Sequence, residues 1–340
     1  MGGDHAPEEI VAGAGLAARE GLGHMLVVGD GARIAPLLVD YPDAALELVH
    51  APGAIAMDAN PSQAVRGSAG TSLGVAIDLV RDGKADAVVS AGNSGAFLAI
   101  ALVRLRTIPG VARPAIAVVY PAKHGPVVVL DSGANVDCRP EWLAQFGVMG
   151  SAYARAVLNI ASPKVGIISV GEERVKGNAQ TIEAARMLEG TAVNFIGNVE
   201  GRDVFVNVAD VFVTDGFVGN VMLKLSEGAA SLIGDIVMTE IKRSNPVERL
   251  GAMLVRPALR RVRDKLSYEN YGGAPLLGLR GNCIVAHGRA NRAAVRSAIR
   301  AAVAEVREDV VGRIGELVAP LGARDAAAVV AQSIASPMEA

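Results

Sequence analysis

Four short polar turns hold most of the side chains in this sequence that could do chemistry. Each turn follows an apolar run with the character of a strand, and the turns lie at 90–96, 131–135, 171–174 and 214–220. A strand, a polar turn and a helix form the unit of an open parallel sheet, which binds ligands beyond the carboxyl ends of its strands. Glycine lets a ligand approach the backbone, and a helix start offers free N–H groups to an anion. We therefore expect the four turns to form the floor of one active site.

Two side chains in these turns could stabilise negative charge. Lys176 belongs to the dense polar cluster 171–178 and could neutralise a phosphate or a developing oxyanion, or it could be an ordinary solvated lysine. Asn220 follows Asp215 in a strand-to-helix turn. It could donate a hydrogen bond to a carbonyl group, or it could cap the next helix.

Two other segments could bind an anion. In the turn 90–96, Gly92, Asn93 and Gly95 come just before a helix, where backbone N–H groups could cradle the anion. The alternative is an ordinary strand-to-helix turn. Arg289 could clamp an anion with two parallel hydrogen bonds, or Asn291 could only cap the helix that follows.

Two further motifs do not predict the function that they first suggest, a dinucleotide site and a cysteine nucleophile. Gly29 and Gly31 follow a strand-like run, but Ile34 stands where a dinucleotide fingerprint needs its third glycine, so a nicotinamide cofactor is not expected. Cys138 has no histidine beside it in the sequence, and we expect an inert thiol.

The composition indicates a large α/β protein and argues against several function classes. The 340 residues are 51% hydrophobic and 20% charged, and the net charge of −2 gives no general attraction for nucleic acid. The two cysteines are far apart and not in metal-ligand spacing, which predicts no disulfide, no metal site and a reducing compartment. The polar N-terminus predicts no signal peptide, and no apolar run approaches the ~20 residues of a spanning helix.

Strand-like runs alternate with helical patterns along the chain. Strands are expected at 25–28, 46–49, 86–89, 115–119, 127–130, 165–170, 192–196 and 210–213. Helices are expected at 8–20, 62–82, 94–106, 140–158, 177–189, 218–241 and 290–318. This alternation predicts an α/β/α sandwich around a mostly parallel, doubly wound sheet. We expect one domain over 1–335, a projecting amphipathic helical segment at 236–271 and a short tail at 336–340.

The order of these motifs resembles the PlsX family, the phosphate acyltransferases of bacterial phospholipid synthesis. The matching stretches span nearly the whole chain and are 1–7, 90–96, 131–141, 197–203, 214–224, 271–278 and 287–291. The resemblance implies a fold like that of phosphotransacetylases and isocitrate dehydrogenase-like enzymes. It also implies transfer of a long-chain acyl group from acyl-[acyl carrier protein] to inorganic phosphate, without a metal or an organic cofactor.

The resemblance implies partners and a location as well. The expected assembly is a homodimer in the cytoplasm, attached peripherally to the inner face of the cell membrane. Its partners would be acyl carrier protein, inorganic phosphate and a downstream glycerol-3-phosphate acyltransferase that consumes the acyl phosphate, and no nucleic acid.

By the same resemblance, Lys176 and Asn220 are the expected catalytic residues. Lys176 would neutralise charge on phosphate and in the transition state, and Asn220 would orient the phosphate or the carbonyl group. The residues expected to hold phosphate are Gly92, Asn93, Ser94 and Gly95, helped by Gly2, Gly3, Asp4 and His5. Further candidates at the site are Asp131, Asn135, Asn178, Asp215, Gly216, His287 and Arg289.

The projecting segment is expected to contact the membrane or the carrier protein. Its apolar side chains would insert into the bilayer, and these are Leu250, Met253, Leu254 and Leu259. Its basic side chains would meet anionic headgroups or the acidic carrier, and these are Arg256, Arg260, Arg261 and Arg263. The alternative is a helical pair packed in a dimer interface.

The sequence departs from the family pattern in two places. Family members normally begin with a strand of the type Ile-Ala-Val-Asp-Ala, whereas Met1 is already the methionine of the motif that follows it. We expect a central strand to be missing, with neighbouring backbone groups left unpaired and a native start upstream. Near the end of 57–72, Gly67, Ala69 and Gly70 replace some of the lysines and serines usual in the family. If those lysines help to bind phosphate or carrier protein, Arg66 and Ser72 must bind it without them.

Two alternative functions stay open at this point. One is a phosphotransacetylase that acts on acyl-coenzyme A, which would lack the amphipathic hairpin. The other is a catalytically idle scaffold that binds lipid or carrier protein and releases no thiol.

Overall fold

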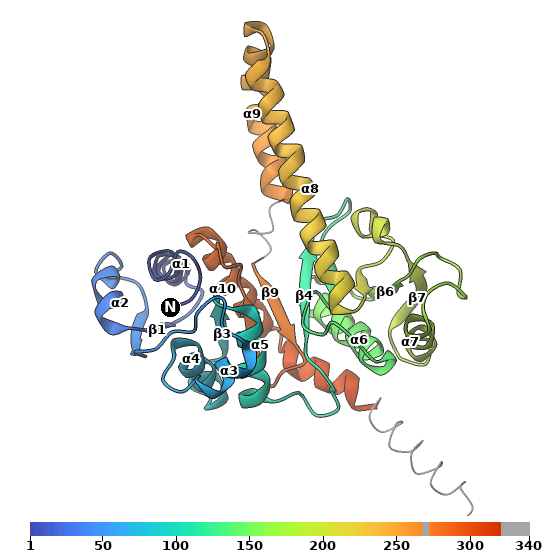
Figure 1. Cartoon of the computed structure of the whole chain (residues 1–340), viewed down its shortest axis with the longest axis horizontal. Coiled ribbons are helices and arrows are strands. Elements are labelled where there is room, and N and C mark those ends of the chain that lie inside the picture. The colour runs from blue at the N-terminus through green and yellow to red at the C-terminus, as the bar shows by residue number, and fades with distance from the viewer. Residues whose placement is uncertain (267–271, 321–340) are drawn as a thin grey trace, which may run out of the picture.

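The structure is a computed structural model that describes residues 1–266 and 272–320. Two sheets form its centre: a two-stranded sheet of order β1-β2 and an eight-stranded sheet of order β3-β10-β9-β4-β5-β8-β6-β7. Helices cover both faces, and a long helical hairpin rises from the body (Figure 1). The predicted α/β/α sandwich is confirmed.

The strands are short and mostly buried. They are β1 (Met25–Gly29), β2 (Leu46–His50), β3 (Ala87–Ser90), β4 (Ala115–Tyr120), β5 (Val127–Leu130), β6 (Lys164–Ile168), β7 (Asn194–Val199), β8 (Val211–Val213), β9 (Ala274–Leu277) and β10 (Asn282–Val285). All four residues of β5 are buried, because alternate side chains enter separate core clusters on the two faces of the sheet.

The helices connect these strands. They are α1 (Glu8–Arg19), α2 (Gly31–Leu38), α3 (Pro61–Arg66), α4 (Ser72–Arg81), α5 (Ser94–Leu105), α6 (Pro140–Ala156), α7 (Ala179–Glu189), α8 (Gly216–Arg243), α9 (Pro246–Leu266) and α10 (Arg292–Arg307), with a 3₁₀-helix at Gly201–Val206. A final helical stretch runs over 310–320.

Two expected helices are each divided in the structure. The expected helix 62–82 is α3 and α4, separated by a turn in which Gly70 has a φ of +71° and Thr71 caps α4. The expected helix 290–318 ends at Arg307, because Asp309 adopts a φ of 46° before the last helical stretch begins. The apolar periodicity continues across the second break, so the pattern did not reveal it. The first break lies in the polar stretch 67–72, whose two glycines were a local turn signal that the expected helix ignored.

Strand direction changes within the eight-stranded sheet. β3 and β10 are parallel to each other, β9 is antiparallel to both β10 and β4, and β4 is antiparallel to β5. β5, β8, β6 and β7 are then all parallel. The sheet therefore has two parallel ends that run in opposite directions, joined by β9 and β4. The sequence analysis did not expect β9, a four-residue strand that contains Pro275, and it did not list β10 as a strand.

Candidate active site

The change of strand direction divides the expected site residues into two clusters. We call the turns after β5, β6 and β8 the α8 cluster, which covers 131–135, 169–178 and 214–220. We call a second group of segments the α5 cluster. It consists of segment 1–5, the turn 90–96 after β3 and the turn 286–291 after β10. β3 runs opposite to β5, β6 and β8, so the turn 90–96 leaves the opposite edge of the sheet. The four turns therefore do not form one floor within a single chain, and only three of them share an edge.

Asp131 organises the α8 cluster from inside the protein. Its side chain is fully buried, and its two carboxylate oxygens accept hydrogen bonds from the N–H groups of Ile116 (2.9 Å), Ala134 (3.1 Å) and Asn135 (2.7 Å). The side-chain amide of Asn135 donates a further bond at 2.9 Å. Burial raises the pKa of Asp131, and these four hydrogen bonds oppose that rise. Asp131 and Asn135 therefore shape the turn, and their polar atoms face each other.

The start of α8 packs directly on this turn. Gly216 donates its backbone N–H to the carbonyl oxygen of Asn135 at 2.7 Å. A Cβ atom on Gly219 would lie 1.9 Å from the carbonyl oxygen of Asp131, so a side chain there would force the helix away. The positive end of the α8 dipole is thereby held at the surface of the cluster.

Two of the candidate residues act as helix caps. Asp215 accepts a hydrogen bond from the N–H of Val218 at 2.8 Å at the start of α8. Asn178 accepts one from the N–H of Thr181 at 2.8 Å at the start of α7. Capping satisfies N–H groups that a helix start leaves without partners.

The two expected catalytic residues are exposed. Lys176 makes no ion pair with any carboxylate of the described residues, and Asn220 is exposed beside the turn glycine Gly133. The amide of Asn198 on β7 donates to the carbonyl oxygens of Glu173 (2.7 Å) and Lys176 (3.1 Å), which fixes the backbone of the loop. Sequence analysis did not assign a role to Asn198, because its partners come from a different turn of the chain.

Cys138 lies beside the α8 cluster as a neutral thiol. Burial, with the charge of Asp131, raises its pKa to about 12. The thiolate is the nucleophilic form of cysteine, so this geometry supports the expectation of an inert thiol.

The α5 cluster is held together by close backbone contacts. Gly3 has a φ of +100° and packs against the carbonyl oxygens of Gly288 and Ala91, and the N–H of Asp4 donates to Gly288 at 2.8 Å. Gly2 lies against Gly92. His5 is exposed, and its carbonyl oxygen accepts the N–H of Glu9 at 3.1 Å.

Asn93 has little capacity left for a ligand. Its side-chain oxygen caps α5 by accepting the N–H of Ala96 at 2.9 Å. Its amide nitrogen donates to the carbonyl oxygens of Met57 (2.8 Å) and Ala59 (3.0 Å). Ser94 is exposed at the first position of α5, and Gly95 lies close to Pro61.

The other cationic candidate lies at the rim of the α5 cluster. The Nδ1 atom of His287 accepts the N–H of Arg289 at 3.1 Å. The guanidinium of Arg289 is exposed and lies 4.0 Å from the carboxylate of Asp4. An exposed pair at that distance contributes little to stability, so the cation stays available to an anion.

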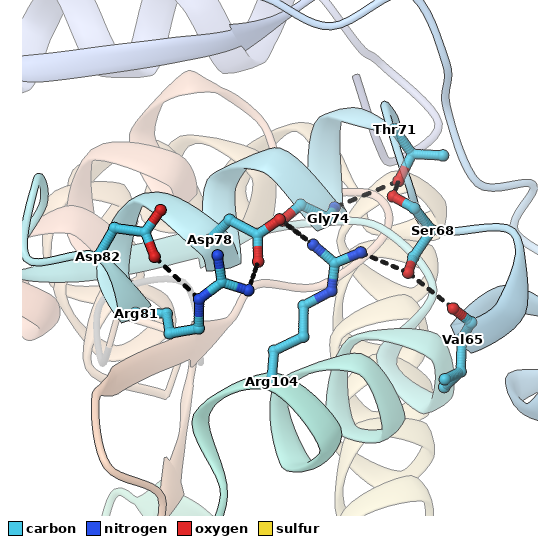
Figure 2. Close-up of polar contacts among 8 residues, drawn as sticks. All are labelled: Val65, Ser68, Thr71, Gly74, Asp78, Arg81, Asp82 and Arg104. Carbon is cyan, nitrogen blue, oxygen red and sulfur yellow. Dashed lines mark hydrogen bonds and ion pairs between the residues drawn. The ribbon is translucent and has the colours of Figure 1, made fainter.

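The segment that departs from the family pattern is held by Arg104 of α5. Figure 2 shows its guanidinium pointing at Asp78, at the carbonyl oxygen of Gly74 (2.9 Å) and at the hydroxyl of Ser68 (2.6 Å). The hydroxyl of Ser68 in turn donates to the carbonyl oxygen of Val65 at 2.7 Å. Ser72 is buried at the start of α4, and only Arg66 remains exposed to meet an anion.

The helical hairpin of α8 and α9 rises from the body (Figure 1), and it exposes apolar side chains along both helices. Every residue of α8 from Gly228 to Glu240 is exposed, so the projecting part begins earlier than the expected 236. In α9, exposed apolar residues include Leu250, Met253, Leu254 and Leu259, with Arg256, Arg260 and Arg261 among them. The side chain of Arg263 lies outside the described residues. No helix in the described ranges is long and apolar enough to cross a membrane.

No metal site was found in the part of the chain that the structure describes. Within 1–266 and 272–320, no three His, Cys, Asp or Glu side chains are grouped so that they could hold a metal ion. The polar groups of the α8 cluster are an ammonium, an amide and the starts of two helices. Such groups bind and neutralise an anion.

The fold places the chain in a structural class with the phosphotransacetylases. It superposes on a phosphotransacetylase from Streptococcus pyogenes with a TM-score of 0.61 and 18% identity, over 89% of this chain and 92% of that one. For the EutD phosphotransacetylase from Staphylococcus aureus the TM-score is 0.59 at 16% identity, over 88% and 91% of the two chains. At these identities the likeness concerns the fold.

The sequence comparisons go further. Residues 1–313 match the family described as fatty acid synthesis protein. Relatives named phosphate acyltransferase include those of Myxococcus xanthus (49% identical, over 89% of this chain and 88% of the relative) and Desulforamulus reducens (46%, over 93% and 95%). The chain therefore belongs to the fatty acid synthesis protein family, the PlsX family expected from its motifs, and is an acyltransferase.

Proposed function

We propose that this protein transfers a long-chain acyl group from acyl-[acyl carrier protein] to inorganic phosphate. The products are an acyl phosphate and the free carrier protein. Relatives of nearly the same length carry the name phosphate acyltransferase, which supports phosphate as the acceptor. The observation that carries the proposal is a pair of exposed side chains that make no hydrogen bond or ion pair with the described residues: Lys176, just before α7, and Asn220, in the first turns of α8.

The reaction needs placement and charge neutralisation more than it needs a strong base. Inorganic phosphate is already an anionic nucleophile at neutral pH, and its oxygen attacks the thioester carbonyl carbon. A C–O bond forms, the C–S bond breaks, and the thiolate leaves and takes a proton from water. Lys176 neutralises the phosphate and Asn220 donates to the carbonyl oxygen as negative charge develops there. The helix starts of α7 and α8 add positive potential at the same edge.

We also propose that the α5 cluster binds an anion. The exposed Ser94, Arg289 and the backbone of 2–5 offer donors there, whereas the side chain of Asn93 is already bonded. We propose that Ser94 and Arg289, and not the amide of Asn93, contact an anion at that edge.

The test of the function is release of thiol from palmitoyl-[acyl carrier protein], measured with and without inorganic phosphate. We expect release that requires phosphate and a product that hydroxylamine traps as the hydroxamate. Release that is independent of phosphate, or no release from folded protein, would contradict the proposal.

The same assay separates the phosphotransacetylase alternative. Palmitoyl-coenzyme A and acetyl-coenzyme A replace the carrier-bound donor at equal concentration. We expect the carrier-bound palmitoyl group to be the preferred donor. A preference for acetyl-coenzyme A would favour the alternative, and binding of carrier protein or lipid without any turnover would favour the idle scaffold.

We further propose that the hairpin of α8 and α9 contacts the inner face of the cell membrane. Its exposed apolar residues lie among arginines, which suits insertion at an anionic surface. Acyl phosphate is an amphiphile, so a peripheral site would deliver it to a glycerol-3-phosphate acyltransferase in the membrane. The same apolar surface could instead pack in the proposed homodimer.

Leu254→Glu tests membrane contact, because Leu254 is 75% exposed near the middle of α9. We expect this variant to lose binding to phosphatidylglycerol vesicles while it keeps activity on soluble substrate. Leu225→Glu is the matched control, since Leu225 is 70% exposed on α8 but lies close to the body. Vesicle binding that survives Leu254→Glu, with a dimer that dissociates, would assign the surface to subunit packing.

A further inference from the structure

The loop that carries Lys176 is held from the side by the outermost strand of the sheet. That strand, β7, is the last in the order of the eight-stranded sheet and pairs with β6 (Figure 1). The side-chain amide of Asn198 on β7 donates to the carbonyl oxygens of Glu173 (2.7 Å) and Lys176 (3.1 Å). A side-chain amide has two N–H donors, so Asn198 uses both of them on this loop.

These two hydrogen bonds fix the backbone of Lys176 in a closed arrangement. The N–H of Lys176 donates to the carbonyl oxygen of Glu173 at 2.9 Å, and the same oxygen accepts the amide of Asn198. The residues that follow are fixed as well, because Gly177 has a φ of +117° and Asn178 caps α7. The turn 173–176 is therefore tied both to itself and to β7.

Two ion pairs also reach the loop, but they lie in solvent. Arg174 pairs with Glu189 of α7 at 3.1 Å, and the arginine side chain is 85% exposed. Glu172 lies 3.8 Å from Arg202, whose side chain is 73% exposed. Exposed ion pairs contribute little to stability. Asn198 is half-buried and bonds to main-chain atoms, so it is the firmer link between the loop and the sheet.

A β-bulge precedes Asn198 in β7. Val165 of β6 pairs with Phe195 of β7. The next residue of β6, Gly166, pairs with Gly197, so β7 contains one extra residue at this point. Gly197 has a φ of +99°, a conformation that residues with a side chain rarely adopt. The bulge therefore depends on a glycine in this position.

The bulge decides which face of the sheet Asn198 joins. Beyond the bulge Asn198 pairs with Ile167, whose side chain belongs to the core cluster formed with α6 and α7. The loop 169–178 runs into α7 on this face. Because strand residues alternate between the two faces, a β7 without the extra residue would direct Asn198 to the opposite face, away from the loop.

We propose that Asn198 is a positioning residue for acyl transfer, which holds the backbone of 173–176 so that the ammonium group of Lys176 reaches the anion. This inference rests on the proposed catalytic role of Lys176. Asn198 acts through the main chain of the loop and makes no contact with the substrate. A displacement of about 1 Å in a positioned group can lower a rate by about 10²-fold, so loss of these hydrogen bonds affects turnover.

The experiment compares Asn198→Ala and Asn198→Asp with the unchanged full chain. Aspartate has nearly the shape of asparagine but offers only oxygen atoms to the two carbonyl groups, and it serves alone where Asn198→Ala does not fold. We expect turnover in phosphate-dependent thiol release to fall by about tenfold or more in both variants.

Asn194→Ala is the matched control. Asn194 is the first residue of the same strand, and its amide donates to Ser162 at 3.4 Å, at the opposite edge of the sheet from Lys176. This variant should keep nearly full turnover.

Hydrogen exchange and a double variant show whether Asn198 acts through the loop. Exchange of the backbone amides of 173–176 should become at least about tenfold faster in Asn198→Ala and stay unchanged in Asn194→Ala. In a Lys176→Ala background, Asn198→Ala should cause no further loss of turnover, because the group that it positions is absent. A merely structural role would lower turnover by the same factor in both backgrounds.

The outcomes separate this inference from the proposed function. Full turnover in Lys176→Ala would contradict the catalytic role of Lys176 and the inference together. A loss in Lys176→Ala with full turnover in Asn198→Asp would overturn the inference alone, and so would equal losses from Asn198→Ala in the two backgrounds. Unchanged exchange of 173–176 in the Asn198 variants would also overturn it, because the loop would then be held without Asn198.

Discussion

The α8 cluster and the α5 cluster are built from the same succession of local elements, but their asparagines have different hydrogen-bond partners. In each, a short strand leads into a turn with glycine and then into a helix capped by a short polar side chain. In the α8 cluster Asp215 is the cap, and Asn220 stays exposed. In the α5 cluster Asn93 is itself the cap, and its amide binds two backbone carbonyl groups. The role of an asparagine here depends on its partners and not on its place after a strand.

The two clusters also differ in what holds them. A buried carboxylate, Asp131, binds four N–H donors beneath the α8 cluster, so the exposed groups above it have a fixed base. The α5 cluster rests on contacts between glycine backbones and on an exposed pair of Asp4 and Arg289 at 4.0 Å. This difference predicts that catalysis depends most on the α8 cluster.

The largest expected effect comes from Lys176→Ala. Loss of the ammonium should lower turnover by about 10²–10³-fold, because the phosphate and the transition state lose their main counter-charge. The unfolding temperature should not change, since Lys176 is exposed and makes no ion pair with the described residues. The measurement is phosphate-dependent thiol release.

Lys164→Ala is the matched control for Lys176→Ala. Lys164 is an exposed lysine at the amino end of β6, the strand that precedes the loop of Lys176, and thus lies at the opposite edge of the sheet. It should keep nearly full activity. Equal losses in the two variants would remove Lys176 from the mechanism.

The second expected effect contrasts the two asparagines. Asn220→Ala should lower turnover by about 10–100-fold with unchanged stability, because only a hydrogen bond to the reacting group is lost. Asn93→Ala should lower the free energy of unfolding by about 2 kcal/mol, because it loses a helix cap and two further hydrogen bonds. Urea unfolding and thiol release of both variants check this contrast. A stability loss in Asn220→Ala with no loss of turnover would reverse the assignment.

The smallest expected effect on turnover concerns a buried carboxyl group in α10, whose ionisation acts on stability. Glu305 of α10 is buried, and among the described residues its Oε1 atom has no hydrogen-bond partner. Burial raises its pKa from 4.5 to about 8, and its charge would act on Tyr153 of α6.

Between pH 4.5 and about pH 8, the carboxyl group of Glu305 is ionised in the unfolded chain and protonated in the folded chain. The contribution of Glu305 to stability should therefore be fully present at and below about pH 4.5 and fall as the pH rises to about 8, with an upper slope of about 1.4 kcal/mol per pH unit. Glu305→Gln should flatten this dependence in urea unfolding at pH 5 and pH 8. The same slope in both proteins would mean that Glu305 ionises in the folded state as it does in water.

Much of the architecture could be predicted from local patterns. The apolar runs at 127–130 and 210–213 became β5 and β8, because continuous β-branched residues suit strands buried on both faces. The helix over 140–158 was expected and is α6, with Pro140 at its first position. The family was also predicted from the sequence, because its motifs recur in order along the chain.

Other features could not be predicted from such patterns. The hydrogen bond from Arg104 to Ser68, which holds the turn at 67–71, joins residues more than thirty positions apart and has no local signal. The strand β9 is too short to stand out, and its pairing with β4 and β10 reverses the sheet. A projecting helical segment was expected, but the point at which it leaves the body could not be predicted, because α8 continues through that point as one helix.

The sequence by itself determined most of the segments that become strands and helices, the family to which the chain belongs, and the residue types that are available for binding an anion. The tertiary structure decided that the turn 90–96 lies at the opposite edge from the turns after β5, β6 and β8, and which polar side chains are already bonded. The physical reason is that local propensity depends on near neighbours, whereas strand direction and hydrogen-bond partners depend on segments far apart in the chain.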